Sequence, residues 1–205
     1  NLIKPFSIIK TKHAGGNDWV TTAVINSRGQ FLEVKQVDEY LESVFMIGDK
    51  LECKIVEKNL IYLMNAEVYN VKFASRSIVL LVDTIQSIKN VRKHKRYDVY
   101  LSSCFCKKGE VCDNYCVVVN VSLEGLSIIT RSKLKAGDII DLNIYFKGFQ
   151  LVSFECEIRW KSKSEQNYLY GLSIKNISEK SKALYRSFIK KLQLKERLLT
   201  KERLL

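Results

Sequence analysis

The feature that most constrains the fold of this chain is a long series of short segments that are apolar or alternate between apolar and polar residues. They are residues 19–25, 31–34, 51–56, 61–64, 67–73, 78–82, 97–105, 115–119, 126–130, 139–145, 151–160 and 168–174. Short segments at regular spacing, with turn residues between them, are typical of β-barrels and sandwiches. One proline and nine glycines in 205 residues argue against a long disordered linker.

A basic, polar stretch at residues 86–96 divides this series into two halves. In each half a Gly-Asp turn, Gly48-Asp49 or Gly137-Asp138, precedes a strand with one apolar face. We therefore predict a mostly β chain of two small β-barrels, a split-barrel-like domain at residues 1–88 and a second domain at residues 89–205. The repeated turn indicates barrels of related construction, although Gly-Asp turns are common enough to arise separately.

The C-terminal segment has a different periodicity. Leu184, Phe188 and Leu192 recur at four-residue spacing among lysines and arginines, and Ser178 is a suitable N-cap residue. This pattern predicts a C-terminal α-helix whose apolar stripe packs on the second barrel. Two roles stay open for the last ten residues, which either continue that packing or meet a partner.

The charge of the chain indicates an anionic partner. The net charge is +12 and the isoelectric point is near 9.4, which leaves nucleic acid, a nucleotide and an anionic membrane as options. No apolar run approaches the ~18 residues that span a bilayer. The first ten residues lack the pattern of a secretory signal. We therefore expect a cytoplasmic protein with no transmembrane segment and with reduced cysteines.

Four of the six cysteines cluster as C-x-C and C-x-x-x-C, at Cys104, Cys106, Cys112 and Cys116. A zinc site is one interpretation of this cluster, but it has no repeated C-x-x-C pair and no nearby histidine. Alternation with Ser103 and Phe105 favours small buried strand residues instead. We predict no metal.

Two polar motifs carry most of the functional information. Residues 92–96 read R-x-x-x-R, and residues 120–125 read N-x-S-x-x-G at the end of a predicted strand. Each motif alone is weakly specific, because basic runs are usually solvated and the second pattern is usually a turn. Their order and their position at the start of a β domain are much more specific.

With these motifs the chain resembles the PilZ family, whose members carry R-x-x-x-R before a six-stranded barrel and [D/N]-x-S-x-x-G on an early strand. The resemblance covers residues 91–177, including the closing strand near Tyr170-Gly171, and a C-terminal helix. Residues 1–88 resemble the N-terminal barrel of flagellar-brake-type members. This resemblance implies a receptor for the bacterial second messenger c-di-GMP, bound at the hinge between two barrels, with no other cofactor.

The resemblance also implies the site residues. Arg92 and Arg96 would contact guanine edges or phosphates, because a guanidinium donates two parallel hydrogen bonds and stacks on purines. Asn120 would meet a guanine edge, Ser122 would offer its hydroxyl, and Gly125 would allow a close turn. Possible additional contacts come from three further residues: Lys93, His94 and Trp160. Many members have a second arginine where this chain has Lys93, and Val91 leaves open whether one or two c-di-GMP molecules bind.

The sequence contains no set of residues that suggests an enzyme. The two histidines, His13 and His94, lie in separate basic segments, and there is no phosphate-binding loop motif. We predict a binding module whose partner is a protein of the motility or surface-polymer machinery. The alternatives are a nucleic-acid-binding β-barrel and a PilZ-like interaction module that no longer binds nucleotide.

Overall fold

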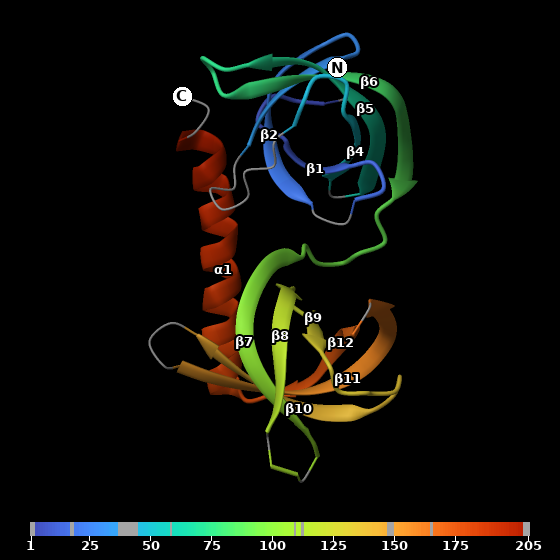
Figure 1. Cartoon of the computed structure of the whole chain (residues 1–205). Helices are drawn as coiled ribbons and strands as arrows, with labels where there is room; N and C mark the ends of the chain where they lie inside the picture. Colours follow the sequence, from blue (N-terminus) through green and yellow to red (C-terminus); the bar gives the residue numbers. More distant parts are fainter. Residues whose placement is uncertain are drawn as a thin grey trace. The chain divides into compact units, whose positions relative to one another are not determined.

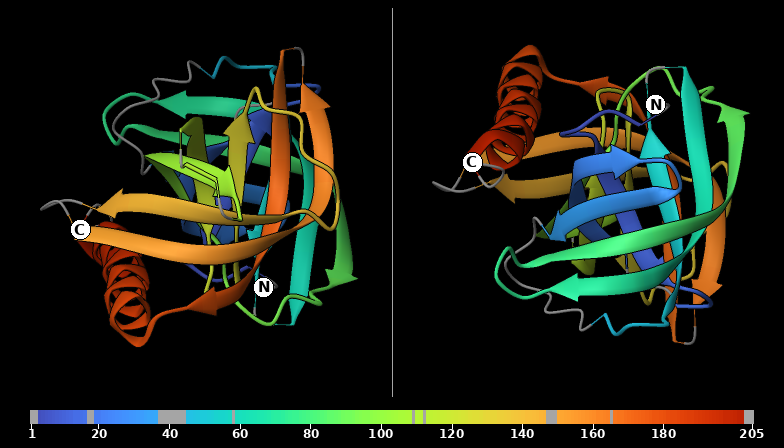
Figure 2. Two further views of the ribbon diagram at one scale, coloured as in Figure 1. Left: turned by 90° about the horizontal axis from the view of Figure 1, so that it is seen from below. Right: turned by 90° about the horizontal axis from the view of Figure 1, so that it is seen from above.

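The computed structural model describes residues 3–16, 19–36, 45–57, 59–108, 110–111, 113–146, 150–164 and 166–202. The chain divides into two compact units. One consists of Asn1–Val91 with Lys195–Leu205, and the other is Arg92–Leu194. Each unit contains a closed barrel of antiparallel strands (Figures 1 and 2), and each barrel encloses an apolar core.

Within the described residues, the first unit forms a closed barrel of six strands in the order β1-β2-β3-β6-β5-β4. The strands are β1 (Ile8–His13), β2 (Val20–Arg28), β3 (Phe31–Gln36), β4 (Lys50–Val56), β5 (Leu60–Lys72) and β6 (Ser77–Lys89). Pairing of β1 with β4 closes the barrel. Its core is built from the inward-facing side chains of all six strands, such as Ile9, Val34, Leu51 and Leu80.

The described part of the second unit also forms a closed six-stranded barrel, in the order β10-β11-β12-β9-β8-β7. The strands are β7 (Tyr97–Lys107), β8 (Asn114–Val121), β9 (Gly125–Thr130), β10 (Ile139–Phe146), β11 (Gln150–Ser164) and β12 (Asn167–Ile177). Pairing of β10 with β7 closes this barrel. The predicted fold class, two β-barrels and a C-terminal helix, is confirmed.

The two barrels share one construction. If the strands of each barrel are numbered one to six along the chain, both barrels have the same neighbours, with the third strand beside the sixth. Three irregularities in strand pairing fall at matching places: at Val24/Asn26, Asn65/Ala66 and Val68/Asn70 in the first barrel, and at Val118/Asn120, Glu155/Cys156 and Ile158/Trp160 in the second. A further irregularity, at Asp98/Leu101 in the second barrel, has no counterpart in the described pairing of β1 with β2. Because β-bulges bend a strand and re-aim its side chains, matching bulges place corresponding residues on the outer face of both barrels.

The repeated Gly-Asp turn has the same geometry in both barrels. Gly48 and Gly137 adopt φ angles of +93° and +90°, a conformation that glycine adopts without steric penalty. The Asp49 carboxylate accepts a hydrogen bond from Met46 N at 2.7 Å, and the Asp138 carboxylate accepts one from Lys135 N at 2.9 Å. The sequence pattern therefore marks a real structural correspondence.

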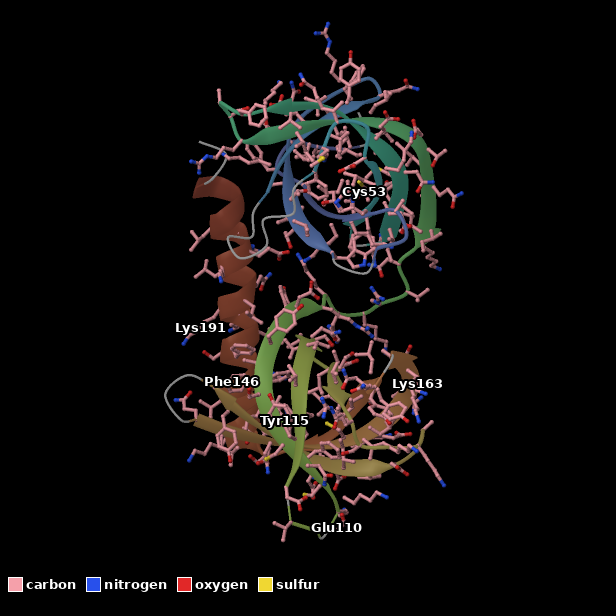
Figure 3. The ribbon with its side chains drawn as sticks, viewed as in Figure 1. Cys53, Glu110, Tyr115, Phe146, Lys163 and Lys191 are labelled. Carbon is pink, nitrogen blue, oxygen red and sulfur yellow. The ribbon has the colours of Figure 1, made fainter. Side chains whose placement is uncertain are left out.

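The helix α1 (Glu179–Glu202) follows β12 and packs its apolar stripe on the second barrel. Ser178 caps it, since the Ser178 Oγ accepts a hydrogen bond from Ser181 N at 3.2 Å. Phe188 lies 4.3 Å from Phe146 between ring centroids, and Phe146 borders α1 in Figure 3. Lys191, on the other side of the helix, points away from the barrel (Figure 3).

Three details of the strands differ from the sequence prediction. The segments 61–64 and 67–73 are one strand, β5, because Tyr62, Met64, Ala66 and Val68 face the core in unbroken alternation. The extra residue of the irregularity at Asn65/Ala66 lies on the neighbouring strand β6. Strand β1 was not predicted, since Ile8–His13 carries three basic residues on its six positions. Strand β6 extends to Lys89, so the basic stretch between the halves begins inside a strand.

The described cysteines differ in burial and in disulfide bonding. Cys53, Cys116 and Cys156 are buried in the barrel cores and are called the core thiols below; Cys53 is labelled inside the first barrel in Figure 3. The expectation of reduced cysteines is wrong for Cys106, which is disulfide-bonded. Cys112 lies outside the described residues. Among the residues that are described, no cluster of histidine, cysteine or acidic side chains could hold a metal ion.

Candidate functional site

A cavity of about 290 Å³ lies on the outer face of the second barrel, where β9, β11 and β12 meet the segment that enters β7. It is lined by Arg92, Lys93, His94, Arg96, Ser122, Glu124, Gly125, Leu126, Arg159, Trp160, Gly171, Leu172 and Ser173. Two predicted motifs thus meet in one pocket. Four of these described residues carry permanent positive charges and one carries a carboxylate, so the pocket favours an anion.

The segment from Arg92 to Arg96 supplies most of the positive charge. Partial burial and then the nearby charge of Arg92 lower the pKa of the Arg96 guanidinium. A bound anion would relieve this repulsion between two like charges. Where the segment enters β7, the Lys95 ammonium lies 5.6 Å from the centroid of the Tyr97 ring.

His94 and Glu124 connect the two motifs directly. The His94 Nε2 lies 3.1 Å from the Glu124 carboxylate, and the Glu124 carbonyl accepts a hydrogen bond from Ile174 N at 3.0 Å. This contact holds the basic segment against the N-x-S-x-x-G turn. The sequence pattern did not reveal it, because Glu124 occupies an unspecified position of that motif.

The turn itself is closed by Ser122 and Gly125. The backbone N–H and the hydroxyl of Ser122 both donate to the Gly125 carbonyl, at 2.8 and 2.9 Å. A Cβ at Gly125 would lie 2.6 Å from the carbonyl oxygen of Leu172 on β12, so the close approach of β9 to β12 requires glycine. Ser122 lines the pocket while its hydroxyl stabilises the turn.

Asn120 is the one predicted motif residue that does not line the cavity in the described structure. It lies nevertheless on the same outer face. Cross-strand pairing connects Asn120 to Ser127, Ser127 to Gly171 and Gly171 to Trp160 in one row across four strands. This row leads from Asn120 at the margin to Trp160 inside the pocket.

A β-bulge on β11 explains why Arg159 and Trp160, although adjacent in sequence, both line the pocket. Ile158 pairs with Leu172 and Trp160 pairs with Gly171, so Arg159 is an extra residue on this strand. The bulge turns Trp160 onto the outer face instead of the core. Regular strand alternation would place Arg159 on the opposite face from Trp160, so the bulge is what brings both residues to the pocket.

Trp160 lies directly over Gly171. A Cβ at Gly171 would be 2.0 Å from Trp160 Nε1 and 2.1 Å from Cε2. Trp160 remains 40% exposed and lines the pocket. Gly171 therefore provides the space in which an exposed aromatic ring forms one wall of a cationic pocket, an arrangement suited to stacking a flat, π-rich group.

Comparison with known proteins identifies the second barrel. Residues 90–191, which cover this barrel and the first half of α1, match the PilZ domain, and the chain belongs to the PilZ domain family. The resemblance inferred from the two motifs is confirmed. No curated protein matches the chain significantly.

Several solved structures have a similar arrangement of strands. The complex of MrkH from K. pneumonia with c-di-GMP aligns with a TM-score of 0.52 at 9% identity, over 94% of this chain and 89% of that one. MotI/DgrA, the inhibitor of motility from Bacillus subtilis, aligns with a TM-score of 0.47 at 15% identity, over 95% of this chain and 100% of that one. YcgR from Escherichia coli in complex with c-di-GMP aligns with a TM-score of 0.47 at 10% identity, over 94% of this chain and 86% of that one. The MrkH alignment shows that the fold of nearly the whole chain is shared.

The described residues include no helix long and apolar enough to cross a membrane.

Proposed function

We propose that this chain is a c-di-GMP receptor that binds the dinucleotide in the pocket between the R-x-x-x-R segment and the N-x-S-x-x-G turn. The observation that carries the proposal is the cationic pocket of a PilZ domain, in which Arg92 and Arg96 lie beside Ser122 and Gly125. The MrkH structure, which contains c-di-GMP in the same fold, supports this ligand.

The chemistry of the pocket fits the two parts of c-di-GMP. Its phosphodiesters are anions that arginine binds through two parallel hydrogen bonds. Its guanines present the O6 and N7 acceptors that arginine also recognises, and their flat rings stack on an indole such as Trp160. The cavity, about 290 Å³, is at the lower limit of small-molecule sites. We therefore propose that it takes one guanine and the adjoining phosphate, with Asn120 contacting a part of the ligand outside the cavity.

The test is a calorimetric titration of the purified chain with c-di-GMP, with c-di-AMP and GTP as controls. We expect a dissociation constant in the nanomolar to low-micromolar range, roughly −8 to −12 kcal/mol. Binding of c-di-AMP should be much weaker, because adenine lacks the O6 acceptor. No heat and no thermal shift at ~100 µM c-di-GMP would refute the proposal.

We further propose that the ligand changes the orientation of the two barrels instead of folding either one. Each barrel has a closed sheet and a core of its own, so neither needs ligand to fold. A ligand that binds one orientation better by ~3 kcal/mol shifts the equilibrium more than a hundredfold. One fluorescent probe on each barrel measures the distance between them. A constant distance at saturation, or a large gain of secondary structure by circular dichroism, contradicts this mechanism.

The proposed role is that of a binding module and not of an enzyme. The pocket has the character of an anion receptor, and the PilZ family resemblance points to a protein partner in the motility or surface-polymer machinery. A cytoplasmic location, where this second messenger acts, belongs to the same proposal. Pull-down with and without c-di-GMP, followed by mass spectrometry, tests whether the partner binds in a ligand-dependent manner.

A further inference from the structure

The turn from Ser122 to Gly125 has the pocket on one side and helix α1 on the other. Ser122 uses all three of its polar groups inside the protein. Its N–H and hydroxyl donate to Gly125, and its carbonyl oxygen accepts a hydrogen bond from the Tyr185 hydroxyl at 2.7 Å. The wall of the pocket is therefore attached from behind to a side chain of α1.

Tyr185 is held firmly in the position from which it donates this bond. Its side chain is 2% exposed and belongs to the core of the second barrel. Its ring packs edge-to-face on Phe154, with centroids 4.9 Å apart. Burial, and then the neighbouring Cys156, raise the pKa of the Tyr185 hydroxyl, so this group stays protonated and remains a donor at physiological pH.

We infer that Tyr185 is a positioning residue for the ligand pocket. Its hydroxyl fixes the Ser122 carbonyl, and through it the turn, in the conformation that forms the pocket wall. Loss of the hydroxyl leaves a buried carbonyl without its partner, and the turn relaxes toward conformations that bind ligand less well. Because coupling is reciprocal, a ligand bound at the turn also stabilises α1 around Tyr185. This inference rests on the proposed binding of c-di-GMP.

The test is the substitution Tyr185→Phe, which removes one oxygen atom and keeps the ring. We expect the dissociation constant for c-di-GMP to rise about tenfold, which corresponds to about 1.4 kcal/mol, together with a lower melting temperature. Calorimetry on the full chain gives the first quantity and thermal denaturation the second. Wild-type affinity in this variant would overturn the inference.

Tyr170→Phe is the matched control. Tyr170 is fully buried in the same barrel, and its hydroxyl donates to the Ser132 carbonyl at 3.1 Å and accepts from Leu134 N at 2.8 Å. The control loses at least as many buried hydrogen bonds as Tyr185→Phe, away from the turn. We expect it to lose comparable stability and to keep the wild-type dissociation constant. An equal loss of affinity in both variants would assign the effect to a loosened barrel and overturn the inference.

Hydrogen exchange provides an independent measurement. In the wild type, c-di-GMP should slow the exchange of backbone amides around Tyr185, and Tyr185→Phe should abolish most of this slowing. Slowing of equal size in both proteins would contradict the coupling. If the wild type itself fails to bind c-di-GMP, the proposed function is refuted, and this is known before any variant is measured.

Discussion

The contact between Gly171 and Trp160 predicts that Gly171→Ala, the smallest possible substitution, lowers both the stability of the domain and its affinity for c-di-GMP. The added Cβ would lie 2.0 Å from Trp160 Nε1 and 2.7 Å from Cδ1, whereas ordinary contacts exceed 3.4 Å. The backbone of β12 is fixed by pairing on both sides. The indole, which is 40% exposed, therefore has to leave its place, and the pocket loses one wall.

The size of the effect follows from the area that the indole covers. A large aromatic side chain buries about 150–250 Å², and somewhat more than half of this area is covered here. At about 25 cal/mol per Å² the contact contributes roughly 2–4 kcal/mol. If half is lost, the variant is destabilised by about 1–2 kcal/mol, and the melting temperature of this domain falls by roughly 5–15 °C. We also expect at least about fivefold weaker c-di-GMP binding.

The assay is tryptophan fluorescence in a Trp19→Phe background, because Trp19 and Trp160 are the two tryptophans of the chain. Gly171→Ala should shift the Trp160 emission to longer wavelength as the indole becomes more exposed. Gly48→Ala is the control, since Gly48 has a φ of +93° and nothing within 4 Å of an added Cβ. It should lower stability through backbone strain and leave Trp160 emission unchanged. Unchanged emission and melting temperature in Gly171→Ala would refute the reasoning.

Three further predictions concern the arginines, the charge and the thiols. Arg92→Ala and Arg96→Ala should each weaken c-di-GMP binding by about 2 kcal/mol, with only partial rescue by lysine, as measured by calorimetry; wild-type affinity in both alanine variants would place the site elsewhere. Random single-stranded DNA should bind weakly and with steep salt dependence in fluorescence anisotropy, whereas submicromolar, salt-insensitive binding would favour a nucleic-acid-binding protein. Burial raises the pKa of each core thiol to about 12, from 9.0, so at pH 8 the half-buried Cys104 should be alkylated before them, as mass spectrometry would show. Because these thiols ionise near pH 9 only when unfolded, their contribution to stability is complete below pH 9 and is lost as the pH rises toward 12.

The sequence was sufficient for the fold and the family because both depend on local patterns. Alternating apolar residues set the strands, and every predicted segment overlaps a strand. Both motifs were also local. Residues 92–96 precede β7, and residues 120–125 connect β8 to β9, so the barrel fold brings the two together. Four of the residues that line the cavity, Arg92, Arg96, Ser122 and Gly125, could be named from such patterns.

Trp160 was named from the sequence as a possible contact, but the packing that builds its wall of the pocket could not be predicted, since it depends on pairing between distant segments. Gly171 and Trp160 meet only through the register of β11 with β12. Arg159 reaches the pocket because of a bulge, and a bulge breaks the two-residue period on which the prediction relied. The contact of His94 with Glu124 joins residues 30 positions apart in the chain. Such irregularities cannot be predicted from a regular alternation of apolar and polar residues.

The shared construction of the barrels shows which described residues of the first barrel stand where the second has its pocket. Gly125, at the start of β9, corresponds by strand order and pairing to Phe31 at the start of β3. Arg159, the extra residue of the bulge on β11, corresponds to Tyr69 on β5. The rings of Phe31 and Tyr69 contact each other, with centroids 5.0 Å apart.

Gly171 has a counterpart as well. Val79 on β6 is the counterpart of Gly171. Each of these two residues pairs with the residue that follows the bulge on the neighbouring strand, and each faces outward. The first barrel therefore has side chains where the second has space, and a tyrosine where the second has an arginine. Because the matching bulges already aim these positions outward, the backbone of a PilZ-like barrel is not sufficient for an anion pocket. Two glycines make the hollow, and the cations give it its charge.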